Sequence, residues 1–248
     1  MPYFMKKIYL FYFLGIFLFV SCSKDEEMNL GQGIKEIPIY YLELPIIPTP
    51  TVNEIKLSYK GRQLTSIIGG FAFMPSAGVP RTVFTDNVYW DVVVKGNRVT
   101  LEKKSFDKAI TFSNRQELRY QGNKIVERKI FENTNTPIIH KYGYNDDLLK
   151  EEQMFRDSQF LSSRTFYYNT AGNLDSLVVS HGFYTHKSVE IFSDYDQKPN
   201  RIKGLMVLEE LLPRALSQNN YLKKSVISIA ESGERVLRQE QTWEPQLF

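Results

Sequence analysis

The sequence predicts a mainly β fold, an antiparallel meander of repeated hairpins with at most one short helix near residues 204–216. Two observations predict it. Runs rich in β-branched and aromatic residues alternate with polar ones, and turn-forming pairs such as Gly-Asn and Gly-Arg separate these runs. A short turn motif also recurs along the chain, as successive hairpins of a meander would produce.

The expected strands are clearest in residues 55–59, 92–94, 98–102 and 124–130, where apolar and polar side chains alternate. Successive side chains of a strand point to opposite faces, so each run offers one apolar face to a core. A helical pattern is confined to residues 204–216, in which leucines recur at helical spacing. Pro213 is expected to end or kink that helix.

The recurring motif carries an apolar or aromatic residue, then turn formers, then a second apolar residue. Its six copies span residues 59–64, 94–99, 120–125, 144–149, 168–174 and 195–202. Gly, Asn and Asp tolerate the positive φ angles that tight hairpins require. One hairpin cannot bury its apolar face alone, so successive hairpins are expected to pack side by side in one sheet.

The copy at 168–174 reads Tyr-Asn-Thr-Ala-Gly-Asn-Leu and resembles the YD (RHS-type) repeat, Tyr-Asp-x-x-Gly-x-Leu. Asn169 stands where that repeat has Asp, and the similar copy at 144–149 lacks the glycine. The resemblance implies a curved antiparallel sheet and no particular activity. The alternative is that any meander with Gly-Asn turns produces this spacing. Residues 217–248 either extend the same sheet or form a separate hairpin.

The amino terminus has the pattern of a signal peptide. Lys6 and Lys7 precede an uncharged apolar run over residues 8–20, which is shorter than the roughly 20 residues that a membrane-spanning helix needs. Ser21 and Cys22, the chain's one cysteine, follow. We therefore assign residues 1–21 to a signal peptide.

Residues 19–22, Phe-Val-Ser-Cys, resemble a bacterial lipoprotein signal, although the commoner first residue is Leu. The resemblance implies that the thiol of Cys22 receives a diacylglyceryl group, that cleavage occurs before Cys22, and that the new amino terminus is acylated, for example with palmitate. Several acyl chains on one residue anchor a protein stably. The alternative is an ordinary secretory signal followed by a cysteine without a role.

The five residues after Cys22 form a short, mainly acidic cluster: Ser23, Lys24, Asp25, Glu26 and Glu27. This cluster resembles the export signal of Bacteroidetes surface lipoproteins, which implies display on the outer face of the outer membrane. The alternative is a solvated start of a tether.

The remaining chain divides into two parts. Residues 22–52, with four prolines, are expected to form a lipidated tether, and residues 53–248 a single β-repeat domain. Within the first part, the apolar stretch 37–44 is expected either to pair as an edge strand or to lie on the body.

Composition excludes several functions. One cysteine allows neither an internal disulfide nor a Cys-rich zinc site. A net charge of +3 over 248 residues does not indicate a nucleic-acid partner. No Gly-x-Ser-x-Gly elbow, P-loop or His-Glu-x-x-His motif occurs. We therefore expect no enzyme, no cofactor and no catalytic residue.

Two sets of polar residues are candidates for a metal site or a catalytic site. His181 and His186, with aspartates nearby in sequence, could approach each other around a turn, but we expect a solvent-facing loop and no metal site. The acidic pairs 146–147, 151–152 and 209–210 are neighbours in sequence, and neighbours on a strand face opposite ways, so we do not expect the facing carboxylates of a glycosidase.

Tyr89, Trp90 and Trp243 are candidates for an exposed platform that binds a sugar or a protein partner, and the alternative is that they fill the core. Tyrosines and phenylalanines at alternating positions within 142–144 and 166–168 predict a ladder of rings on one face of the sheet.

The leading interpretation is a surface-anchored outer-membrane lipoprotein that acts as a non-enzymatic binding or structural module. Its expected partners are the outer membrane, through the lipid anchor, and a glycan or a protein at the cell surface. The first alternative is a carbohydrate-binding or nutrient-uptake accessory lipoprotein, and the second is a glycan-active hydrolase.

Overall fold

The computed structural model describes residues 28, 30, 33–39, 54–76, 79–132 and 134–243. The predicted signal peptide, Cys22, the export signal at 23–27 and most of the predicted tether lie outside the described residues.

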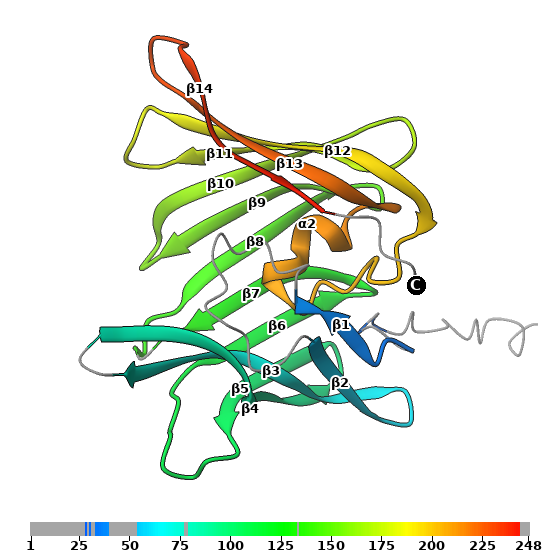
Figure 1. Cartoon of the computed structure of the whole chain (residues 1–248), viewed down its shortest axis with the longest axis vertical. Coiled ribbons are helices and arrows are strands. Elements are labelled where there is room, and N and C mark those ends of the chain that lie inside the picture. Colours follow the sequence, from blue (N-terminus) through cyan, green and yellow to red (C-terminus); the bar gives the residue numbers. More distant parts are fainter. Residues whose placement is uncertain are drawn as a thin grey trace, which may run out of the picture.

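In this part of the chain, 14 strands form one antiparallel sheet in which every strand pairs with its neighbours in sequence (Figure 1). The strands are β1 (Glu36–Pro38), β2 (Glu54–Lys60), β3 (Gln63–Ser76), β4 (Val79–Lys95), β5 (Arg98–Ser105), β6 (Arg115–Gln121), β7 (Lys124–Phe131), β8 (Ile138–Asn145), β9 (Leu148–Arg156), β10 (Gln159–Tyr168), β11 (Leu174–His181), β12 (Lys187–Pro199), β13 (Asn219–Ile229) and β14 (Arg235–Thr242). The predicted meander is confirmed.

The first five copies of the motif are the turns of five successive hairpins, β2–β3, β4–β5, β6–β7, β8–β9 and β10–β11. Their turn residues adopt positive φ, for example 57° at Gly96 and 51° at Asp146. The residue that closes each copy is buried: Leu64, Val99, Ile125, Leu149 and Leu174. The sixth copy, 195–202, leads the chain from β12 into the interior instead of into a tight turn.

Four of these hairpins share a β-bulge directly after the buried closing residue. The strand register skips one residue at Thr65, Val126, Lys150 and Asp175. A bulge adds one residue to one strand and so shifts the alternation of faces. Arg128 and Glu152, three residues after Ile125 and Leu149, are buried as a result.

A chain of tyrosine hydroxyls joins successive hairpins. Tyr144 donates a hydrogen bond of 2.9 Å to the carbonyl of Ile125, and Tyr168 donates one of 2.9 Å to the carbonyl of Leu149. Tyr195 bonds to the carbonyl of Leu174 in the same way. In the last three copies the first residue thus contacts the closing residue of the copy before it, which gives a physical reason for their Tyr-to-apolar pattern.

The sheet curves so that residues 200–217, which we call the inner segment, lie on its concave side (Figure 1). The inner segment contains the 3₁₀ turn η3 (Glu209–Leu211) and the helix α2 (Leu212–Ala215), so the short helix predicted within residues 204–216 is confirmed. Its apolar side chains join the strands in one core. Pro213 stands in the first turn of α2 and begins this helix, where a missing N–H costs nothing, so the expectation that it ends one is wrong.

No helix among the described residues is long and apolar enough to cross a membrane.

Both ends of the described chain belong to the sheet. β1 pairs antiparallel with β2 and carries the fully buried Ile37, so the edge-strand alternative holds for residues 37 and 38, while residues 40–44 of the predicted stretch lie outside the described residues. At the other end, β13 pairs with β12 and β14 pairs with β13. The segment from 219 to 242 therefore extends the same sheet.

Replacing Tyr168 by Phe is expected to lower the free energy of unfolding by about 1 kcal/mol, because the change removes a partly buried hydrogen bond to the carbonyl of Leu149. Urea unfolding followed by circular dichroism measures the change. Tyr167→Phe is the matched control, since Tyr167 is 44% exposed, and it should change the free energy by less than about 0.5 kcal/mol. Equal effects of the two substitutions would show that the hydrogen bond from Tyr168 to Leu149 does not stabilise the fold.

Candidate functional site

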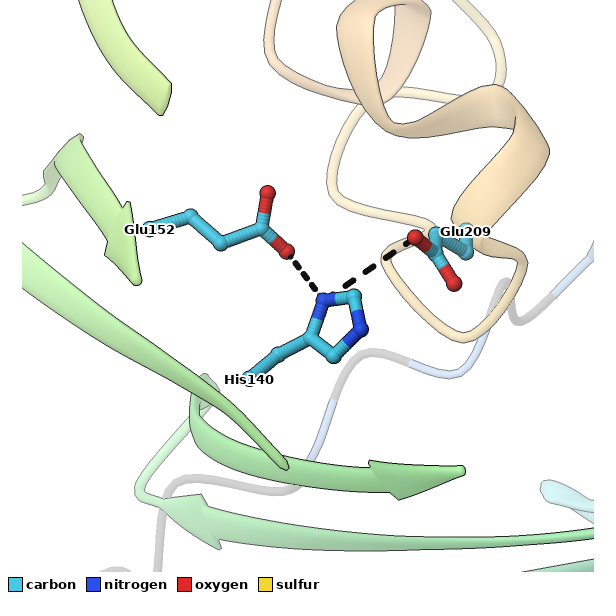
Figure 2. Close-up of side chains that lie close together, drawn as sticks. All are labelled: His140, Glu152 and Glu209. Atoms are coloured by element: carbon cyan, nitrogen blue, oxygen red, sulfur yellow. Dashed lines mark hydrogen bonds and ion pairs between the residues drawn. The ribbon is translucent and has the colours of Figure 1, made fainter. Parts of the chain in front are cut away.

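A cluster of charged side chains forms where the inner segment meets the middle of the sheet. Four strands supply one member each, namely Arg128 from β7, His140 from β8, Glu152 from β9 and Arg164 from β10. Glu209 of η3 comes from the inner segment (Figure 2). We call these five residues the polar cluster.

Glu152 is the centre of the polar cluster and its side chain is 0% exposed. One carboxylate oxygen lies 2.7 Å from Nδ1 of His140, and the other accepts a hydrogen bond of 3.1 Å from Arg164. Burial alone would raise the pKa of Glu152, but the hydrogen bond with His140 and the charges of Arg164 and His140 hold this pKa below its ordinary value. Glu152 is therefore a carboxylate that is fixed and neutralised by its neighbours.

Arg128 joins the sheet to the inner segment. Its guanidinium donates a 2.5 Å hydrogen bond to the carbonyl of Met206, and one of its nitrogens lies 3.7 Å from a carboxylate oxygen of Glu209. The other carboxylate oxygen of Glu209 lies 3.9 Å from both His140 and Arg164. Because Arg128 is only 1% exposed, losing these contacts would leave a buried charge without compensation.

Two further groups border the polar cluster. The buried hydroxyl of Tyr142 has no hydrogen-bond partner among the described residues, and burial together with the nearby carboxylate of Glu152 raises its pKa. Glu210 follows Glu209 in η3 and its side chain is exposed to solvent.

His140, Glu152 and Glu209 could in principle hold a metal ion, because their ligand atoms all lie within 4.8 Å of one another. However, each of the two carboxylates already faces an arginine. A divalent cation would add two positive charges to a buried group whose acidic charges are balanced. The arrangement is better suited to joining two segments of the chain than to binding a metal.

The sheet separates the three residues of the predicted platform. Tyr89 stacks on the exposed Phe106 with ring centroids 4.5 Å apart, whereas its neighbour Trp90 packs against the core. Trp243 also packs against the core, where it covers the buried guanidinium of Arg214 at 4.6 Å. These three aromatic residues do not form one surface.

The loop between β11 and β12 does bring His181 and His186 together, with their ring centroids 5.4 Å apart. Of the acidic pairs, Glu152 and Glu209 converge although they belong to different pairs. Alternation places Glu151 on the face opposite Glu152, as expected for neighbours on a strand.

A cavity of about 720 Å³ lies elsewhere, between the N-terminal edge of the sheet and the start of the inner segment. Its charged lining residues are Lys35, Glu36, Glu54, Lys198 and Arg201. None of the five residues of the polar cluster lines it.

No protein-family model matches the chain, and no curated protein matches it. Six chains of solved structures match it. Among them is the crystal structure of a porin-like protein from Bacteroides uniformis, which is 12% identical with a TM-score of 0.48. The match covers 73% of this chain and 74% of that chain.

Glu152→Gln is expected to lower the free energy of unfolding by about 3 kcal/mol at pH 7, because it leaves buried positive charge without its partner. Glu151→Gln, on the opposite face, is the control and should cost less than about 0.5 kcal/mol. Chemical denaturation at several pH values measures both.

The cost of Glu152→Gln should also depend on pH in one direction. The pKa of Glu152 is lower in the folded chain, so ionised Glu152 stabilises the fold above its ordinary pKa of 4.5, and this contribution is lost as the pH falls through the folded value. The difference in stability between the wild type and Glu152→Gln should therefore begin to shrink as the pH falls below 4.5. A difference that stays constant down to pH 3 would contradict the ionised state of Glu152.

Proposed function

We propose that the protein is a lipid-anchored module at the surface of the outer membrane that binds a partner without catalysing a reaction. The proposal that the protein binds its partner at the surface rests on the inner segment. This segment fills the core side of the curved sheet with the protein's own side chains. Ligands would then contact the strand ends, the loops and the outer face. The anchoring part rests on Cys22 and the residues that flank it.

The polar cluster supports a non-enzymatic function. Glu152 and Glu209 approach closely enough for a pair of glycosidase carboxylates. Yet Glu152 is fully buried, and both of its oxygens are engaged by His140 and Arg164. Because a nucleophile or a general acid needs contact with its substrate, we assign the polar cluster to the joining of the inner segment to the sheet.

A carbohydrate-binding function is the second candidate, and exposed rings at the loop between β11 and β12 favour it. Phe183 is 60% exposed and Tyr184 is 65% exposed, while most other large rings of the sheet are buried or half-buried. Rings of this kind offer flat apolar faces to a ligand.

Replacing Cys22 by Ala is expected to move the protein from the membrane fraction to the soluble fraction, since the thiol that carries the lipid would be gone. Fractionation of cells followed by immunoblotting measures this. Ser23→Ala is the control and should stay with the membrane. If the Cys22→Ala protein remains in the membrane fraction, the lipid anchor is wrong.

Protease treatment of intact cells tests the orientation. The wild type should be degraded, whereas replacement of Asp25, Glu26 and Glu27 by Ala should leave a membrane-bound protein that the protease does not reach. Protection of the wild type on intact cells, with cleavage only after lysis, would contradict display at the surface.

A further inference from the structure

Three exposed rings gather at the end of β11 and in the loop that joins it to β12. The ring centroids lie 5.4 Å apart for His181 and His186, 5.1 Å for Tyr184 and His186, and 6.3 Å for His181 and Tyr184. We call these three residues the rim cluster. All three side chains are exposed, and the exposed ring of Phe183 adjoins them in sequence.

Contacts on both sides hold the loop that carries the rim cluster. The amide of Gly182 donates a 2.7 Å hydrogen bond to the carbonyl of Leu161 on β10. A Cβ atom at Gly182 would lie 2.6 Å from the carbonyl oxygen of Phe160, so only glycine fits this close approach. On the other side, Thr185 bonds to Glu231 in the β13–β14 turn at 3.3 Å. The rings are therefore largely positioned before any ligand arrives, which lowers the entropy cost of binding.

The register of β11 places the rim cluster at the edge of the concave face. His181 shares a face with Val179 and with Leu177, which is buried in the core. On that same face, Arg164 pairs with Val179 and Glu190 pairs with Leu177. Arg164 and Glu190 are engaged by Glu152 and Lys224, so the rim cluster itself, at the open end of β11, is the part of this face that a ligand can reach.

The composition and size of the rim cluster indicate the class of ligand. A stable protein interface buries about 800 Å² on each partner and involves about 20–30 residues a side, which is far more than this loop offers. Tyrosine and imidazole rings combine flat apolar faces with nitrogen and oxygen atoms that form hydrogen bonds. A sugar ring has the matching chemistry, with C–H groups on its faces and hydroxyls on its rim.

We propose that the rim cluster is a binding site for a neutral saccharide, with one sugar ring stacked on Tyr184 and its hydroxyls bonded to the imidazoles of His181 and His186. This inference rests on the proposed binding function and names the ligand class and the site.

Binding is measured with the full chain in detergent micelles, by isothermal titration calorimetry and saturation-transfer NMR in the presence of EDTA. The probes are maltohexaose, cellohexaose, xylohexaose and mannohexaose. We expect at least one of them to bind, Tyr184→Ala to weaken its binding about tenfold, and Tyr184→Phe to retain most of it because the ring remains. Tyr167→Ala, an exposed ring on β10, is the matched control and should change the affinity less than twofold.

Three results would overturn the inference. The first is that none of the four saccharides binds at millimolar concentration. The second is binding that Tyr184→Ala leaves unchanged while Arg201→Ala, in the cavity beside β1, abolishes it; the binding function would then stand and the site would be wrong. The third is binding that appears only when Zn²⁺ replaces EDTA, which would assign the imidazoles to a metal ion. The Cys22 and protease experiments use no saccharide, so failure of the proposed anchor and surface display is detected separately.

Discussion

A single sheet has two faces, and a curved sheet that presents an apolar concave face to water is not stable by itself. The rest of this structure depends on how that constraint is met. The chain leaves β12 at the sixth copy of the hairpin motif, fills the concave side with the inner segment, and returns as β13. Leu205 and Leu211 of this segment are fully buried, so the segment replaces the second layer that most β proteins build from another sheet or helices.

An inner segment held by apolar contacts alone could shift along the strands. The charged contacts of the polar cluster fix its position relative to them. Arg128 contacts both the carbonyl of Met206 and the carboxylate of Glu209, so one buried guanidinium fixes the height of the inner segment against β7. Glu152 balances the positive charge from the sheet side. Buried ionic groups contribute little net stability but strongly penalise alternatives that break them. We interpret the polar cluster as a set of buried contacts that hold the inner segment in one position on the sheet.

Much of the sheet could be predicted from the sequence because each hairpin carries its own turn chemistry. Gly96 and Asp146 stand where positive φ is needed, and the closing residues of the copies are all buried. The polar cluster could not be predicted in the same way. Strict alternation from Ile125 and Leu149 turns Arg128 and Glu152 outward, and only the bulge after each closing residue turns them in.

The position of the inner segment was beyond sequence reasoning as well, since a short run of leucines fits either a surface helix or an interior one. The bulge recurs with the motif in four hairpins, but no residue pattern in the sequence marks it, so the cluster had no sequence signal of its own. For the rim cluster, the spacing of His181 and His186 around a turn indicates that the two rings can approach each other. The contacts of Gly182 and Thr185, which hold the loop, leave no recognisable pattern in the sequence.

Native-state hydrogen exchange tests most directly whether the inner segment is an integral layer of the fold. The amides of Leu205 and Leu216, bonded to the carbonyls of Ile202 and Leu212, should exchange as slowly as those in the centre of β8 and β9, with the free energy of global unfolding. Exchange of these two amides through local opening, several kcal/mol below the strands, would show that the sheet stands without the inner segment and would contradict this account.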